Sequence, residues 1–97
     1  MDVQQHDHEN KGRFFIEDNG RDAAAMHYIY TGDGQMLIDH TEVSVDYEGK
    51  GLGKQLVKAA VLFARKNSIK IIPQCPFARG VFDRVEEYRD VLADEAE

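Results

Sequence analysis

The most informative stretch of this chain is residues 43–54, VSVDYEGKGLGK, in which a β-branched run leads into a glycine-rich turn that opens into a helical pattern. Three glycines alternate with Lys50 and Leu52 and let backbone N–H groups come close to a ligand. The same groups stand at the start of the predicted helix, where unpaired donors and the helix dipole favour an anion. The turn therefore indicates a phosphate-bearing ligand. The alternative is a tight strand-to-helix connection that binds nothing.

Composition limits the class of protein and its partners. The chain has 97 residues, which suits one small domain. It holds 12 Lys and Arg against 18 Asp and Glu, so its net charge is −6. This charge disfavours nucleic acid or an anionic membrane as a partner, because either would need a basic face. The sequence has no long apolar stretch and no signal-peptide core, so we expect a cytoplasmic protein.

The domain has short polar ends. Residues 1–12 lack an apolar pattern and are expected to form a disordered N-terminal segment, and residues 93–97 are expected to be a loose acidic tail. His6 and His8 could ligate a metal, but no cysteine or acidic cluster at ligand spacing accompanies them, so no metal is expected. The predicted domain spans residues 13–92.

Short apolar runs predict strands before and after the central helix. Asn-Gly at residues 19–20 and Gly-Asp-Gly at residues 32–34 favour hairpin turns between antiparallel strands. A fourth run is reached through a helical crossover, so it is expected to lie parallel to the third. The predicted strands are Arg13–Asp18, Ala23–Thr31, Met36–Val45 and Ile69–Ile72.

The spacing of apolar residues changes to the helical period after the glycine turn. Gly51–Asn67 carries a wide apolar stripe, which predicts a helix packed across a sheet. Pro73 and Pro76 end the pairing of the fourth strand, and a second helix is expected over Phe77–Leu92. The predicted fold class is α/β, with an antiparallel meander that leads into a parallel strand pair and two or more helices packed on the sheet.

This order of elements resembles the GNAT superfamily of acyl-CoA-dependent N-acyltransferases. Residues 48–53 (EGKGLG) resemble its phosphate-binding motif Gln/Arg-x-x-Gly-x-Gly/Ala, with Glu48 where Gln or Arg is usual. His40–Val43 (HTEV) and Ile71–Phe77 (IIPQCPF, a Pro-x-Cys-Pro segment) look like the small single-domain branch of that superfamily. The resemblance implies a compact fold in which the ends of the parallel strands splay apart.

The resemblance also implies acetyl-CoA as the acyl donor and assigns residues to it. The pyrophosphate is expected on the backbone amides of Gly49, Lys50, Gly51, Leu52, Gly53 and Lys54, with added charge from the two lysines. Val43 and Val45 match the positions that pair with the pantetheine arm as an added strand would. The amide of Val43 is the expected oxyanion donor for the thioester carbonyl.

Cys75 is the predicted reactive atom of the site. By the resemblance it lies at the end of the fourth strand, where the thioester would rest. Its thiol is a candidate nucleophile that accepts the acyl group. It is equally a candidate proton donor, because Phe77 and Phe82 occupy the helix in which many family members carry a catalytic tyrosine. The remaining alternative is a small buried apolar side chain.

His40 is the predicted base, either for the thiol of Cys75 or for an incoming ammonium. A structural histidine bonded to backbone is the alternative. Strict alternation would place His40 with Ile38 and Glu42 on one face of the strand. Both faces would then be mixed in polarity, which predicts a bulge or an edge position.

The sequence thus predicts an N-acetyltransferase that acts on an unidentified amine of a small molecule or a protein. The acidic surface favours a cationic acceptor. A coenzyme A or acyl-CoA binding module with little catalysis is the alternative, and a structural domain whose glycine turn binds nothing is a third. A monomer or a weak dimer is expected.

Overall fold

The computed structural model describes residues 2–93 and contains one five-stranded sheet in the order β1-β2-β3-β4-β5. Neighbouring strands are antiparallel from β1 to β4, and β5 is parallel to β4. This confirms the predicted α/β class, the meander and the parallel pair. The strands are β1 Gln4–His8, β2 Lys11–Asp18, β3 Arg21–Tyr30, β4 Gln35–Val43 and β5 Lys70–Pro73.

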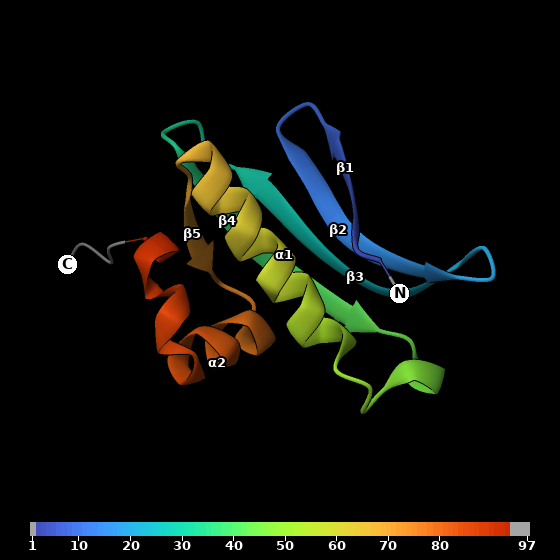
Figure 1. Cartoon of the computed structure of the whole chain (residues 1–97). Coiled ribbons are helices and arrows are strands. Elements are labelled where there is room, and N and C mark those ends of the chain that lie inside the picture. Colours follow the sequence, from blue (N-terminus) through green and yellow to red (C-terminus); the bar gives the residue numbers. More distant parts are fainter. Residues whose placement is uncertain (1, 94–97) are drawn as a thin grey trace.

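The helices lie on one face of the sheet, where α1 crosses the strands and α2 lies beside it (Figure 1). Helix α1 presents five fully buried residues to the sheet at helical spacing: Leu56, Val57, Ala60, Val61 and Ala64. They pack in one core with strand residues such as Met26 and Ile38. Burial of each leucine or valine contributes about 1.5–3 kcal/mol. The helical segments are η1 Val45–Tyr47, α1 Leu52–Asn67, α2 Pro76–Arg84 and η2 Glu86–Val91.

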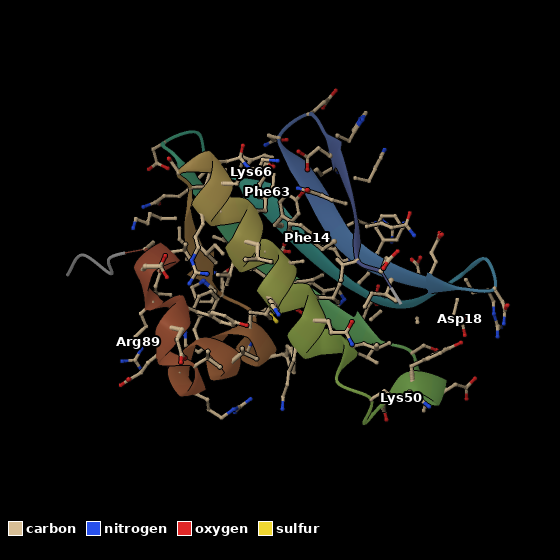
Figure 2. All side chains as sticks on the ribbon, viewed as in Figure 1. Phe14, Asp18, Lys50, Phe63, Lys66 and Arg89 are labelled. Carbon is tan, nitrogen blue, oxygen red and sulfur yellow. The ribbon has the colours of Figure 1, made fainter. Side chains whose placement is uncertain are left out.

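An aromatic contact ties the helix layer to the middle of the sheet. Phe14 of β2 meets Phe63 of α1 edge to face, with the ring centroids 5.8 Å apart (Figure 2). Phe14 also contacts Tyr28 of β3, at 5.2 Å between centroids. The position of α1, and with it the glycine turn that precedes α1, is therefore set by core packing as well as by the backbone.

The prediction of a disordered N-terminal segment is wrong for β1. Gln5 donates a hydrogen bond to the hydroxyl of Tyr28 (2.8 Å), and that hydroxyl donates to Asp7. Tyr30 donates to the other carboxylate oxygen of Asp7, at 2.9 Å. These bonds reach from β1 past β2 to β3. The sequence of β1 carries no apolar signal because all five of its residues are exposed, and the strand is held by backbone pairing with β2 and by these hydrogen bonds to distant tyrosines.

The C-terminal part differs from the prediction in two ways. The expected single helix is interrupted at Val85, whose extended backbone (φ −111°, ψ 96°) separates α2 from η2. Ala93 was expected in the loose tail, but its N–H donates to the carbonyl of Ile71 in β5, at 2.8 Å. The rest of the predicted tail, residues 94–97, lies outside the described residues. Across residues 2–93, no helix has the length and apolar character that a membrane span requires.

Candidate active site

The ends of β4 and β5 separate beside the start of α2. The two strands pair from Gln35 opposite Lys70 to Ile38 opposite Pro73, and β4 continues to Val43. The carbonyl of Ile38 accepts the N–H groups of both Gln74 and Cys75, each at 3.0 Å, where the chain leaves the sheet. The predicted splayed ends are thus confirmed, and residues 39–43 of β4 have an edge from which β5 has diverged.

The amide of Val43 points to that open edge. The next N–H along the chain, of Ser44, donates to the carbonyl of Ala23 in β3 at 2.9 Å. Successive N–H groups of a strand point to opposite edges. The N–H of Val43 is therefore directed away from β3, as the predicted pantetheine and oxyanion role requires. The role itself stays a prediction.

The glycine turn forms one wall of a pocket at the start of α1. Gly49 and Gly51 have φ angles of 80° and 78°, which glycine adopts without strain. In the described part of the chain, residues 2–93, no side chain caps the first turn of α1, so its N–H groups are left for another acceptor. The pocket has a volume of about 310 Å³. Its lining residues are Val43, Tyr47, Glu48, Gly49, Gly51, Leu52, Gly53, Lys54 and Phe77.

Six of the eight residues predicted to bind the cofactor line this pocket, and Lys50 and Val45 do not. Lys50 lies on the loop between η1 and α1 (Figure 2). The prediction that Val45 extends the third strand is wrong. The strand ends at Val43, and Val45 lies in the η1 turn with 75 % of its surface exposed. The turn is held by the hydroxyl of Tyr47, which donates to Asp18 at the end of β2.

A β-bulge in β4 decides which side chains face the helices. His27 of β3 lies opposite His40, and Tyr28 lies opposite Ile38, so Asp39 is the extra residue. Bulges of this kind shift the alternation of side chains. Ile38 and Thr41 consequently share the helix-covered face, and His40 moves to the other face. The predicted bulge is confirmed.

Cys75 lies on the helix-covered side, at the position that precedes α2. Its side chain is buried, with 5 % exposure, and its sulfur lies 3.1 Å from the hydroxyl oxygen of Thr41. Sequence reasoning missed Thr41. The signal that could have found it was the predicted bulge, because one extra residue in β4 turns Thr41 toward Cys75.

His40 belongs to a separate cluster on the uncovered face of the sheet. Its ring stacks on that of His27, with centroids 5.7 Å apart. Glu42 lies beside both rings, 3.4 Å from Nε2 of His40 and 3.6 Å from Nε2 of His27. The expectation that His40 serves as the base for the thiol of Cys75 is therefore wrong in this structure, because β4 separates the two side chains.

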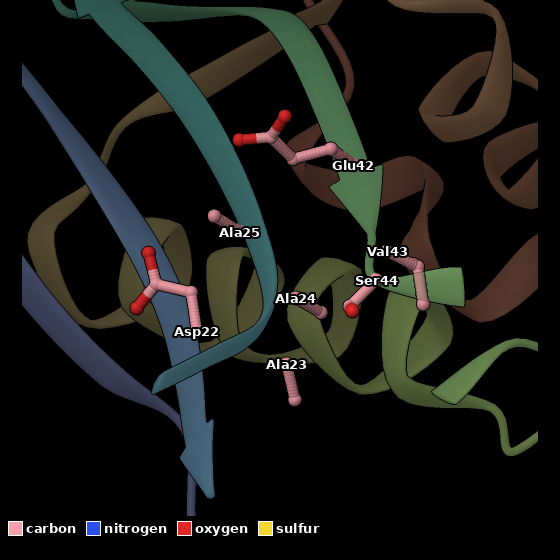
Figure 3. Close-up of a pocket in the computed structure, with 7 residues that line it drawn as sticks. All are labelled: Asp22, Ala23, Ala24, Ala25, Glu42, Val43 and Ser44. Carbon is pink, nitrogen blue, oxygen red and sulfur yellow. The ribbon is translucent and has the colours of Figure 1, made fainter. Parts of the chain in front are cut away.

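A second pocket, of about 240 Å³, opens next to this cluster (Figure 3). The carboxylates of Asp22 and Glu42 flank it, and the small side chains of three consecutive alanines leave it open. Val43 lines this pocket and also the glycine-turn pocket. Across residues 2–93, no group of three or more His, Cys, Asp or Glu side chains is arranged to hold a metal ion. The lining residues are Asp22, Ala23, Ala24, Ala25, Glu42, Val43 and Ser44.

The curated relatives of this chain include protein NATD1 from several vertebrates. The chicken (Gallus gallus) protein is 37 % identical over 73 residues, which cover 73 % of this chain and 66 % of that protein. The mouse (Mus musculus) protein is 35 % identical over 72 residues, with coverages of 73 % and 64 %. This chain thus spans slightly less than two thirds of the length of these relatives.

Solved structures share the fold of this chain. A GCN5-like protein from Staphylococcus aureus has a TM-score of 0.73 and 36 % identity, with 97 % of this chain and 91 % of that chain covered. The ribosomal-protein-alanine N-acetyltransferase of Brucella melitensis has a TM-score of 0.67 at 19 % identity, with coverages of 93 % and 67 %, and supports the fold alone. The family model described as GCN5-related N-acetyl-transferase matches residues 13–91. This chain therefore belongs to the GCN5-related N-acetyltransferase (GNAT) family.

Proposed function

We propose that this chain transfers the acetyl group of acetyl-CoA to a primary amine. Family membership supports acyl transfer as the class of reaction. The observation that carries the proposal is the continuity of the site: Val43 lines the pocket at the glycine turn, and its N–H points to the open edge of β4. A bound acetyl-CoA would supply a thioester, whose acetyl carbon is the electrophile.

The glycine turn is suited to the diphosphate of this ligand. Within residues 2–93 no side chain caps the first N–H groups of α1, and the neighbouring Gly49 and Gly51 have no side chain that would obstruct a ligand. Hydrogen bonds to a charged group contribute about 1.5–3 kcal/mol each. Lys54 lines the same pocket and adds positive charge. Glu48 also lines it and opposes an anion, so the amides carry most of the binding.

The open edge of β4 is suited to the pantetheine arm, whose amides can pair with a strand edge as an added strand does. The N–H of Val43 then stabilises the negative charge that develops on the thioester oxygen during attack. In direct transfer, the amine nitrogen bonds to the acetyl carbon, the carbon–sulfur bond breaks, and the coenzyme A thiolate takes up a proton. Cys75 is the candidate donor of that proton.

The acceptor is proposed to approach from the uncovered face of the sheet. An ammonium group must lose a proton before it can attack. Glu42, with His40 and His27 beside it, is the candidate acceptor of that proton. The pocket beside Glu42 (Figure 3) suits a cationic acceptor through the Glu42 carboxylate, because the carboxylate of Asp22 on its other side is paired with Arg13 at 2.6 Å. In this arrangement the acid and the base lie on opposite faces of β4.

A covalent route through Cys75 is the second mechanism to test. The thiolate would attack the acetyl carbon, release coenzyme A and form an acetyl-cysteine, from which the amine then takes the acetyl group. Burial beside Thr41 suits a positioned thiol. Intact mass after incubation with acetyl-CoA distinguishes the routes: an acetyl adduct that Cys75→Ala abolishes supports the covalent route, and unmodified protein that still releases coenzyme A supports direct transfer.

Binding is tested by thermal unfolding with coenzyme A and acetyl-CoA. A ligand at 100 times its Kd stabilises the folded state by about 2.7 kcal/mol. In an NMR titration with the same two ligands, the backbone amide signals of residues 49–54 should shift. Unchanged unfolding and unchanged signals with both ligands would overturn the proposal.

Catalysis is tested by release of coenzyme A, measured chromatographically with a panel of primary amines. Amine-dependent release that falls in Glu42→Gln, and falls less in Lys66→Gln on the far end of α1, supports the enzyme. Tight binding without release for any amine would favour a coenzyme A binding module. That alternative has one specific observation in its favour: α2 contains no tyrosine, and the nearby Tyr88 of η2 packs against Phe82, at 6.1 Å between ring centroids.

A further inference from the structure

Phe77 of α2 lies against Gly53 in the first turn of α1. A Cβ atom added at Gly53 would lie 2.6 Å from Cζ of Phe77 and 2.8 Å from its Cε2, closer than carbon atoms approach. Gly53 is buried in this contact. The aromatic ring thus occupies the space that any other residue at position 53 would need.

Gly53 differs in this respect from the other glycines of the turn. Gly49 and Gly51 have positive φ angles, and within residues 2–93 nothing lies within 4 Å of a Cβ added at either one. Gly53 lies in the first turn of α1 and has no positive φ, so its backbone conformation does not require glycine. Backbone conformation therefore explains Gly49 and Gly51. The glycine at position 53 is explained by the ring of Phe77.

Phe77 is more exposed than the other apolar residues of α2. Three other apolar residues of α2, Ala78, Val81 and Phe82, are buried, with at most 3 % exposure. Phe77 is 39 % exposed, and it lines the glycine-turn pocket together with Val43 and Leu52. The ring therefore presents an open surface to this pocket between the first turn of α1 and the open edge of β4.

We propose that Phe77, seated on Gly53, is a specificity-determining residue that forms the apolar wall for the pantetheine arm. This rests on the proposed function, because it assumes that the glycine turn binds the diphosphate. A chain that runs from the amides at the start of α1 to the N–H of Val43 passes through the pocket that the ring lines. Phe77 then favours a ligand that carries the arm over the nucleotide part alone.

The experiment compares two ligands that share the diphosphate. Coenzyme A carries the pantetheine arm, and ADP lacks it. In calorimetric or NMR titrations, Phe77→Ala should weaken binding of coenzyme A by about tenfold and change ADP binding by less than about twofold. Leu62→Ala, which truncates an exposed apolar residue of α1 outside the pocket, is the control and should change neither. Equal losses for both ligands, or no loss for coenzyme A, would overturn the role of Phe77.

A size exchange tests the contact independently of ADP. Gly53→Ala should weaken coenzyme A binding because the new methyl group displaces the ring. Gly53→Ala combined with Phe77→Leu should regain part of that affinity, since leucine lacks the outer ring atoms. A double variant no better than Gly53→Ala would contradict the proposed contact. A wild-type chain that binds neither coenzyme A nor ADP would instead overturn the proposed function, so the two failures are distinguishable.

Discussion

The hydroxyl oxygen of Thr41 lies 3.1 Å from the sulfur of Cys75, at the point where β4 and β5 separate. The contact bridges two segments whose strand pairing has already ended at Ile38 and Pro73. It fixes the direction of the only thiol in the sequence.

Removal of the contact between Thr41 and Cys75 should lower the stability of the fold, and part of the loss should require both residues. We expect Thr41→Val to lower the free energy of unfolding by about 0.5–1.5 kcal/mol, the usual net value of a hydrogen bond. A double-mutant cycle with Cys75→Ala, followed by urea denaturation, isolates the pair. A cycle in which the two substitutions are simply additive would mean that the contact contributes nothing.

Alanine substitutions at Gly12 and Gly80 should change the stability of the fold in opposite directions. A Cβ at Gly12 would lie 2.5 Å from the Asp7 carboxylate and 2.6 Å from the Tyr28 hydroxyl, so Gly12→Ala forces the anchor of β1 apart. We expect a loss of about 1–3 kcal/mol, as for other overpacked sites. Gly80 is helical, and its added Cβ would meet Arg84 at 3.5 Å, an ordinary contact. Gly80→Ala should stabilise by about 0.5–1 kcal/mol. The midpoints of urea denaturation measure both changes. Stability changes of the same sign for Gly12→Ala and Gly80→Ala would contradict the prediction.

The tyrosine anchor of β1 should make the fold sensitive to alkali. Burial, together with the hydrogen bond to Asp7, raises the pKa of Tyr28 well above its ordinary value of 10.0 and raises the pKa of Tyr30 to about 12. A pKa raised on folding contributes stability that is present below the unfolded value and is lost as the pH rises toward the folded one. The free energy of unfolding should therefore fall above about pH 10. Tyr30→Phe should reduce the slope of that fall; an unchanged slope would contradict the role of Tyr30.

The pairing of Arg65 with Asp90 should matter at neutral pH and not in acid. Two hydrogen bonds, of 2.9 and 2.8 Å, join the guanidinium of Arg65 to the carboxylate of Asp90 and hold the pKa of Asp90 below its ordinary value of 3.8. Stability from a lowered pKa is present above the unfolded value and is lost as the pH falls through the folded one. Asp90→Asn should thus be less stable than wild type at pH 7, with a gap that closes below about pH 4 and shrinks in high salt. Guanidinium chloride would mask the effect, so urea melts at several pH values are the measurement. A gap that persists in acid would show that Asp90 acts through something other than its charge.

The most local features of the sequence were the most predictable. Gly51–Asn67 was predicted as the central helix, and α1 spans Leu52–Asn67. Its apolar spacing and the glycines before it are properties of neighbouring residues, which a single sequence displays. Five of the six predicted cofactor residues at positions 49–54 line one pocket for the same reason, since the turn and the first turn of the helix are contiguous.

Features that depend on distant partners were not predictable. The sequence of β1 is polar; the strand pairs with β2 and is joined by side-chain hydrogen bonds to Tyr28 and Tyr30, two strands away. Val45 lies outside the strand, in the η1 turn that the Tyr47–Asp18 bond joins to the end of β2. The break at Val85 lets η2 return to β5, where Leu92 lies beside Ile71.

Periodicity and a contiguous motif are properties of neighbouring residues, so the order of the elements from β2 to the start of α2, the glycine turn and the family resemblance could be predicted from the sequence. Which chemical groups share a face depends instead on long-range strand pairing. The register of β4 against β3 fixes the bulge at Asp39, and that single extra residue turns Thr41 toward Cys75 and sends His40 and Glu42 to the opposite face. A strand alternates its side chains with a period of two, so one unpaired residue reverses the orientation of every residue that follows it.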